Sequence, residues 1–277
     1  MSLQYTFKTL SAITYTIRPS ATLGTCLLTF AAFNPQEGEW NQAWLLVVSM
    51  FFGSAFCFMI NDIYDREKDL LNKKSRPIAT GVISMPTAIK VTVIFACLLL
   101  IFSWFLGIHV FLLAIAFLLG TGIYSFINAR TGLLANSIVA LIAAGTQWGI
   151  LVLKPDYYLW ASSVFLFFFT VPREVLLDWL DIDGDRAWGK RSFPMYYSLP
   201  KVKVLVGFCL LMATSALLLL LEKRSFDLSA IFFAIGIVSL WASFFPFFQN
   251  ASNKTALLSV RISHVTYAFL ILALLSR

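Results

Sequence analysis

The sequence contains nine apolar runs, each about as long as a helix that crosses a lipid bilayer. Such a helix needs about 20 mostly apolar residues. Charged residues make up 13% of the chain, about half of the ~25% typical of soluble domains, which excludes a water-soluble globule and a secreted disulfide scaffold. No long linker separates the runs, so we expect an all-α membrane protein that forms one domain over residues 1–277. The nine expected transmembrane helices are 15–33, 42–61, 87–106, 108–128, 133–153, 157–177, 201–221, 228–248 and 255–276.

Basic residues are distributed unevenly over the loops of this nine-helix arrangement. With a cytoplasmic N-terminus, 17 of the 21 lysines and arginines lie on the cytoplasmic side, as the positive-inside rule predicts. The two longest polar stretches, 62–86 and 178–200, then both face the cytoplasm, and the C-terminus lies on the opposite side. The formal net charge of +7 is therefore a topology signal, and no nucleic-acid partner is needed to explain it.

Two copies of the pattern Asp-x-x-Asp-x-x-x-Asp stand in these polar stretches. Corresponding aspartates are 116 residues apart and four expected helices separate the copies, which indicates two equally oriented, pseudo-repeated halves. On one continuous helix this spacing confines three carboxylates to an arc of about 60° and a length of about 10 Å. The alternative is ordinary helix-end acids in a solvated loop. The two triads are Asp62, Asp65 and Asp69, and Asp178, Asp181 and Asp185.

Each triad has the chemistry of a site for a hard cation. Neighbouring carboxylates repel one another unless a cation lies between them, and oxygen ligands without histidine or cysteine favour Mg²⁺ first, then Ca²⁺ or Mn²⁺. The four cysteines and two histidines form no cluster in the sequence, which argues against zinc. Mg²⁺ commonly binds substrate phosphates together with one or two carboxylates, so two facing triads could hold a diphosphate. The basic residues near the triads are Arg66, Lys73, Arg76, Arg130, Lys190 and Arg191.

These motifs resemble those of the UbiA-type family of intramembrane prenyltransferases, and the resemblance covers most of the chain. The family's first signature, Asn-Asp-x-x-Asp-x-x-x-Asp, matches residues 61–69, and an Arg-Pro pair at 76–77 follows it as in the family. The second signature matches residues 173–191, which begin with Arg-Glu and end with Lys-Arg. The Arg-Pro pair at 18–19 is similar to one near the start of the family's first helix.

One position departs from the family pattern. Tyr124, Arg130 and Asn136 match, whereas Ala129 stands where family members have a lysine that contacts the diphosphate. The resemblance therefore implies that Arg130 makes this contact alone.

The resemblance implies a bundle of nine transmembrane helices around a central cavity, with both triads at its cytoplasmic mouth. It also implies Mg²⁺-dependent transfer of a polyprenyl group from a polyprenyl diphosphate to a lipophilic acceptor, which is a quinone-precursor aromatic ring, a glycerophosphate or a tetrapyrrole. The implied catalytic residues are Asp62, Asp65, Asp178 and Asp181. The implied metal ligands are these four together with Asp69 and Asp185. The implied diphosphate contacts are Asn61, Arg66, Arg76, Arg130, Lys190 and Arg191.

Two alternatives share these features. The same metal and diphosphate apparatus suits an intramembrane terpene cyclase, in which the prenyl chain attacks itself. A non-catalytic protein that binds or transports isoprenoids on the same fold is the other alternative. Cyclic product formed without an acceptor would indicate the cyclase.

Overall fold

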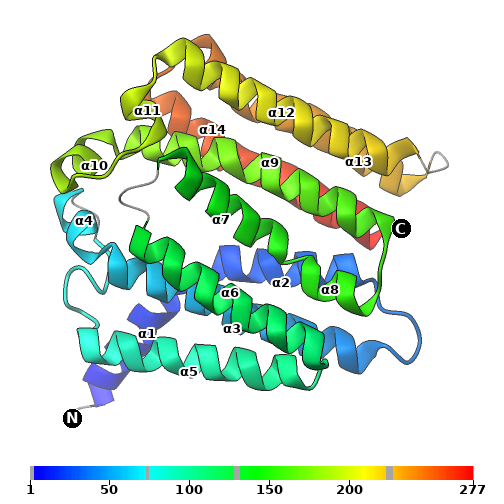
Figure 1. Cartoon of the computed structure of the whole chain (residues 1–277), viewed down its shortest axis with the longest axis horizontal. Helices are drawn as coiled ribbons and strands as arrows, with labels where there is room; N and C mark the ends of the chain where they lie inside the picture. The colour runs from blue at the N-terminus through cyan, green and yellow to red at the C-terminus, as the bar shows by residue number, and fades with distance from the viewer. Residues whose placement is uncertain (1–2, 73–74, 128–131, 223–226, 277) are drawn as a thin grey trace. The chain divides into compact units, whose positions relative to one another are not determined.

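The computed structural model describes residues 3–72, 75–127, 132–222 and 227–276 (Figure 1). Every regular element in these ranges is a helix, which confirms the predicted all-α class. The chain divides into two compact units, each of which contains one aspartate triad. Unit 1 comprises residues 1–30 and 35–126, and unit 2 comprises residues 31–34 and 127–277.

Unit 1 is built around two long apolar helices that pack against each other, α3 and α5 (Figure 1). The helix α3 is 25 residues long and carries Asn61 and Asp62, the first two residues of the first signature, near its C-terminal end. The helices of this part of the chain are α1 (Leu3–Thr16), α2 (Pro19–Phe33), α3 (Trp40–Tyr64), α4 (Arg66–Leu71), α5 (Met85–Trp104) and α6 (Ile108–Ile127).

Unit 2 is built around α9, which packs against α7, α12 and α14. The side chains of Phe165 and Phe169 on α9 are fully buried and stack with ring centroids 5.2 Å apart. The helices of this part are α7 (Leu133–Gly145), α8 (Trp148–Leu153), α9 (Tyr157–Leu180), α10 (Ile182–Trp188), α11 (Phe193–Tyr196), α12 (Leu199–Glu222), α13 (Leu228–Gln249) and α14 (Asn253–Leu275).

Seven helices in the described ranges are long and apolar enough to cross a membrane. They expose large apolar side chains, such as Leu119 on α6 and Val204 on α12, which are 62% and 72% exposed. Water disfavours such surfaces, whereas the hydrocarbon interior of a bilayer accepts them. The chain is therefore an integral, multi-pass membrane protein. The seven helices are α3, α5, α6, α9, α12, α13 and α14.

The two other expected transmembrane helices are interrupted. The expected helix at 15–33 is divided between α1 and α2, because Pro19 lacks an N–H and is suited to the first turn of a new helix. The expected helix at 133–153 is divided between α7 and α8 at Thr146 and Gln147. With 15 and 13 residues, α2 and α7 are shorter than the ~20 residues of a spanning helix. The count of nine spans stays a prediction.

An apolar cluster in unit 1 fixes α1 and the segment before α5 against the end of α3. Met59, one turn before Asp62, is fully buried in this cluster, and Ala12 joins it from α1. Ile78 and Ile83, each 1% exposed, join it from the segment between α4 and α5. This packing holds the chain on either side of the cluster close to the first triad.

Candidate active site

In both triads the second aspartate marks the end of a long helix. Asp65 follows α3 and precedes α4, with φ −81° and ψ 4°. Asp181 follows α9 and precedes α10, with φ −100° and ψ 6°. The expected column of three carboxylates on one continuous helix is therefore wrong. Aspartate is a poor interior helix former, and the apolar run that stabilises each long helix ends at this point.

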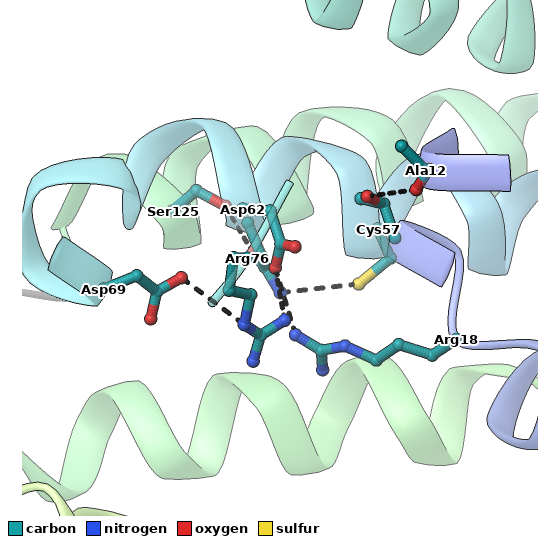
Figure 2. A network of polar contacts seen from close by, with 9 residues as sticks. Ala12, Arg18, Cys57, Asp62, Asp69, Arg76 and Ser125 are labelled. Atoms are coloured by element: carbon teal, nitrogen blue, oxygen red, sulfur yellow. Dashed lines mark hydrogen bonds and ion pairs between the residues drawn. The ribbon is translucent and has the colours of Figure 1, made fainter. Parts of the chain in front are cut away.

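Asp62 receives two guanidinium groups on one oxygen atom (Figure 2). An Arg18 Nη2 donates to Asp62 Oδ1 at 3.1 Å, and Arg76 Nη1 donates to the same oxygen at 2.7 Å. Arg76 Nε also lies 3.5 Å from Asp69 Oδ2. Asp62 is 2% exposed, and its other oxygen, Oδ2, is buried and has no hydrogen-bond partner among the described residues. One carboxylate oxygen is thus held by cations while the other is left for a further ligand.

Arg76 stays charged because of the carboxylates that face it. Burial lowers the pKa of its guanidinium, but the charges of Asp62 and Asp69 and the hydrogen bond to Asp62 raise it more, so the net shift is upward. The short segment after Arg76 is folded back by bonds from the Thr80 N–H to the Arg76 carbonyl and from the Ile83 N–H to the Pro77 carbonyl. The guanidinium of Arg76 therefore stays charged, and the backbone that carries it is held in place.

Three other predicted site residues of unit 1, two diphosphate contacts and one metal ligand, have different surroundings. Asn61 Oδ1 accepts a hydrogen bond from Ser125 Oγ at 2.8 Å, so this amide is tied to α6 (Figure 2). Arg66 is exposed at the start of α4. Asp65, between them, is half-buried. Lys73 and Arg130 lie outside the described residues.

In unit 2 a buried lysine takes the place that Arg76 has in unit 1. Lys190 Nζ lies 2.7 Å from Asp178 Oδ1 and 3.4 Å from Asp185 Oδ2. Its side chain is 4% exposed, and the Asp185 side chain is completely buried. Gly189 ends α10 in the left-handed conformation at φ 81°, and the Lys190 N–H donates to the Asp185 carbonyl at 2.8 Å. Glycine adopts this conformation without strain, so the turn brings the lysine back over α10.

A buried amide completes the surroundings of Asp178. Asn136 Nδ2, from α7, donates to Asp178 Oδ2 at 3.0 Å. Both oxygens of Asp178 are therefore hydrogen-bonded, one to an amide and one to Lys190. Arg191, the next predicted contact, is exposed.

The two units thus share one arrangement of charges. In each, the first and third aspartates are buried, and one basic side chain of the described residues contacts both: Arg76 in unit 1 and Lys190 in unit 2. Buried carboxylates seven residues apart are stable near each other only with positive charge between them. The repeated spacing in the sequence therefore corresponds to a repeated electrostatic arrangement.

The residues that could hold a metal are carboxylates whose charge is already balanced by a cation. In the described part of the chain, no three His, Cys, Asp or Glu side chains lie close enough to hold a metal ion by themselves. Mg²⁺ needs only one or two carboxylates when phosphate oxygens and water complete its shell. The orphaned Asp62 Oδ2 and the all-oxygen ligand set fit such a shared site.

A cavity of about 570 Å³ opens beside Asp62 in unit 1. Its wall has two guanidinium groups, two serine hydroxyls and one tyrosine against a single carboxylate. None of the other acidic residues of the first triad lines it. The residues that matter for its chemistry are Tyr15, Arg18, Ser20, Asp62, Ser75 and Arg76.

Two contacts of these carboxylates were not among the site residues predicted from the sequence. They are Arg18, which binds Asp62, and Asn136, which binds Asp178. Both belong to positions that match the family pattern, and that match is the signal that could have identified them.

The fold and these charged centres define a class: a polytopic helical membrane protein with two centres of buried aspartates, each paired with a basic side chain. The chain belongs to the UbiA prenyltransferase family, whose sequence pattern matches residues 22–271. The digeranylgeranylglyceryl phosphate synthase of Thermococcus kodakarensis is 30% identical over 158 residues, which are 57% of this chain and 57% of that protein. The matched region thus spans little more than half the length of that relative.

Solved structures show the same fold. The apo structure of a UbiA homologue from Aeropyrum pernix has a TM-score of 0.77 at 14% identity and covers 92% of this chain and 98% of its own. The structure of a UbiA homologue from Archaeoglobus fulgidus bound to GPP and Mg²⁺ has a TM-score of 0.65 at 19% identity, with 96% and 100% covered.

Proposed function

We propose that the protein transfers a polyprenyl group from a polyprenyl diphosphate to a glycerophosphate lipid, in a reaction that depends on Mg²⁺. The observation that carries this proposal is the pair of buried aspartate centres, each with one cation across its first and third carboxylates. Membership of the UbiA prenyltransferase family supports prenyl transfer. The names of relatives such as that of Thermococcus kodakarensis support the glycerophosphate acceptor.

The proposed reaction exchanges one carbon–oxygen bond for another. The bond between C1 of the prenyl group and the diphosphate breaks, and its electron pair leaves with the diphosphate. The acceptor hydroxyl oxygen forms a new bond to C1 and releases its proton. No protein nucleophile is needed, so the protein's task is to stabilise the departing anion and to exclude water from the allylic cation.

Mg²⁺ would be held by one or two carboxylates of a triad at a time, with water and phosphate oxygens completing its shell. The candidate ligands are Asp62, Asp65 and Asp69 in unit 1 and Asp178, Asp181 and Asp185 in unit 2. When bound, Mg²⁺ would neutralise the charge that develops on the diphosphate. Basic side chains add to this effect: Arg76 and Lys190 already contact the carboxylates of the two centres, and Arg66 and Arg191 are exposed. We assign the remaining diphosphate contacts to Asn61 and Arg130.

We further propose that both units act as one domain over residues 1–277, with the N-terminus and both triads on the cytoplasmic side and the C-terminus opposite. The continuous family match across both units supports the single domain. The distribution of basic residues supports the orientation.

The test is turnover of the purified full chain in lipid nanodiscs, with labelled geranylgeranyl diphosphate and geranylgeranylglyceryl phosphate. Asp62→Asn and Asp178→Asn should nearly abolish the ether product, as should EDTA in the wild type. Asp183→Asn is the matched control, because Asp183 is exposed on α10 and belongs to neither set of buried carboxylates. Full activity in EDTA would refute the mechanism, and a cyclic product formed without acceptor would identify a cyclase instead.

A further inference from the structure

The cavity beside Asp62 has the charge and the groups of a site for a phosphate monoester. Two guanidinium groups face one carboxylate there, and serine hydroxyls complete the wall. Guanidinium groups bind phosphate oxygens through two parallel hydrogen bonds, which a carboxamide or hydroxyl cannot reproduce. A volume of about 570 Å³ lies within the ~300–1,000 Å³ of ligand pockets.

Arg18 is held at this cavity by an unusual backbone. It has φ 49°, in the left-handed region that side-chain-bearing residues seldom adopt. Glycine would occupy the position without strain, yet an arginine stands there. Its guanidinium lies 4.5 Å from the centre of the Phe58 ring, and one Nη donates to Asp62. Strained residues of this kind concentrate at functional sites.

The guanidinium of Arg18 keeps room for a further anion. Among the described residues, it contacts Asp62 through one hydrogen bond and packs on the ring of Phe58, and the side chain remains 38% exposed. Arg76, by contrast, contacts both Asp62 and Asp69. Both arginines line the cavity, and Arg18 is the more exposed of the two, at 38% against 27%.

We propose that Arg18 binds the phosphate of the acceptor lipid and selects acceptors that carry one. This inference rests on the proposed function. The cavity extends from Asp62 toward Tyr15 and Ser20 and does not include Asp65 or Asp69. A phosphate bound at Arg18 would therefore lie beside Asp62 and away from the other two carboxylates of the triad. The glycerol hydroxyl next to that phosphate would then lie near the proposed position of the diphosphate. Arg18 is a specificity-determining residue in this reaction.

The experiment compares two acceptors in the purified full chain: geranylgeranylglyceryl phosphate and the same lipid with a hydroxyl in place of the phosphate. Arg18→Gln should raise the KM for the phosphorylated acceptor by about 10- to 100-fold, the value of one charge-assisted contact. The KM for geranylgeranyl diphosphate and the KM for the unphosphorylated acceptor should not change. For Arg18→Lys, the KM for the phosphorylated acceptor should lie between those of the wild type and Arg18→Gln. Lysine keeps the positive charge but cannot form the two parallel hydrogen bonds of a guanidinium.

Two further variants separate binding from folding. Arg18→Gly removes the guanidinium and relieves the left-handed strain, so it should melt no lower than Arg18→Gln and show the same acceptor defect. Lys90→Gln, at an exposed position on α5 that does not line the cavity, should match the wild type in both acceptors.

Equilibrium binding of radiolabelled geranylgeranylglyceryl phosphate without any prenyl donor distinguishes this inference from the proposed function. Tight wild-type binding that Arg18→Gln weakens supports the site even if no transfer occurs. Competition by glycerol phosphate but not by inorganic phosphate identifies the source as the lipid headgroup, and equal competition by inorganic phosphate would overturn the headgroup assignment. A raised KM for geranylgeranyl diphosphate in Arg18→Gln would overturn the inference, because the cavity would then belong to the donor. Unchanged kinetics for both substrates would do the same.

Discussion

Replacement of Lys190 by methionine should destabilise the metal-free protein strongly. Lys190 Nζ contacts Asp178 and Asp185, and all three side chains are at most 10% exposed. Methionine preserves most of the side-chain length but removes the ammonium group that contacts two buried carboxylates. Removal of one partner from a buried ion pair costs about 3–5 kcal/mol. For a chain of this size each kcal/mol corresponds to about 2–4 °C, so the melting temperature should fall by roughly 6–20 °C.

The assay is thermal unfolding in nanodiscs with EDTA and again with excess Mg²⁺. If Mg²⁺ binds these carboxylates, it should restore part of the loss in Lys190→Met and change the wild type less. Asp178→Asn combined with Lys190→Met should lose less stability than Lys190→Met alone, because one of the two buried charges is then absent. Lys254→Gln, at an exposed position on α14, is the control. A melting temperature for Lys190→Met equal to that of the wild type in EDTA would refute the reasoning.

Three other expectations concern single positions. Asn136→Ala removes the amide that donates to Asp178 at 3.0 Å and should weaken Mg²⁺ affinity about 10- to 100-fold. The assay is the Mg²⁺ dependence of turnover, and an unchanged dependence would show that this amide is only structural. Arg130→Ala should lower prenyl transfer about 10- to 100-fold if Arg130 contacts the diphosphate, whereas a pure membrane anchor would lower expression and leave specific activity intact. Glu67→Cys and Asp183→Cys, each made separately, should both react with a membrane-impermeant maleimide from the cytoplasmic side, and labelling of either from the other side would contradict the proposed orientation.

The long helices of the fold could be predicted from the sequence because each is an apolar run of sufficient length. The interruptions could be predicted only in part. At residues 18–19 the proline gives a local reason for a new helix. At Thr146 and Gln147 the surrounding sequence is apolar, and the break depends on tertiary packing: Gln147 is fully buried, a placement that no local pattern encodes.

The site was predictable as a set of residue types but not as a set of contacts. The spacing of the aspartates identified both centres, and the family resemblance identified Arg76 and Lys190 as their basic neighbours. The pairing of each cation with the first and third carboxylates arises from turns, such as the one at Gly189, and from the apolar cluster around Met59. The turns and the apolar packing determine which carboxylates a basic side chain reaches. The spacing of residues in the sequence does not contain that information.

The helix junctions at Asp65 and Asp181 have a consequence for how mutant phenotypes are interpreted. Neither side chain accepts a hydrogen bond from the helix that follows it, although aspartate commonly caps a helix in this way. Alanine at either junction therefore removes a carboxylate without removing a cap. At the first and third positions, by contrast, the carboxylate is buried in an ion pair, and its loss disturbs folding and chemistry together. The middle aspartate of each triad is thus the position where the carboxylate can be removed without loss of a helix cap, and where lost turnover reports most directly on the carboxylate itself.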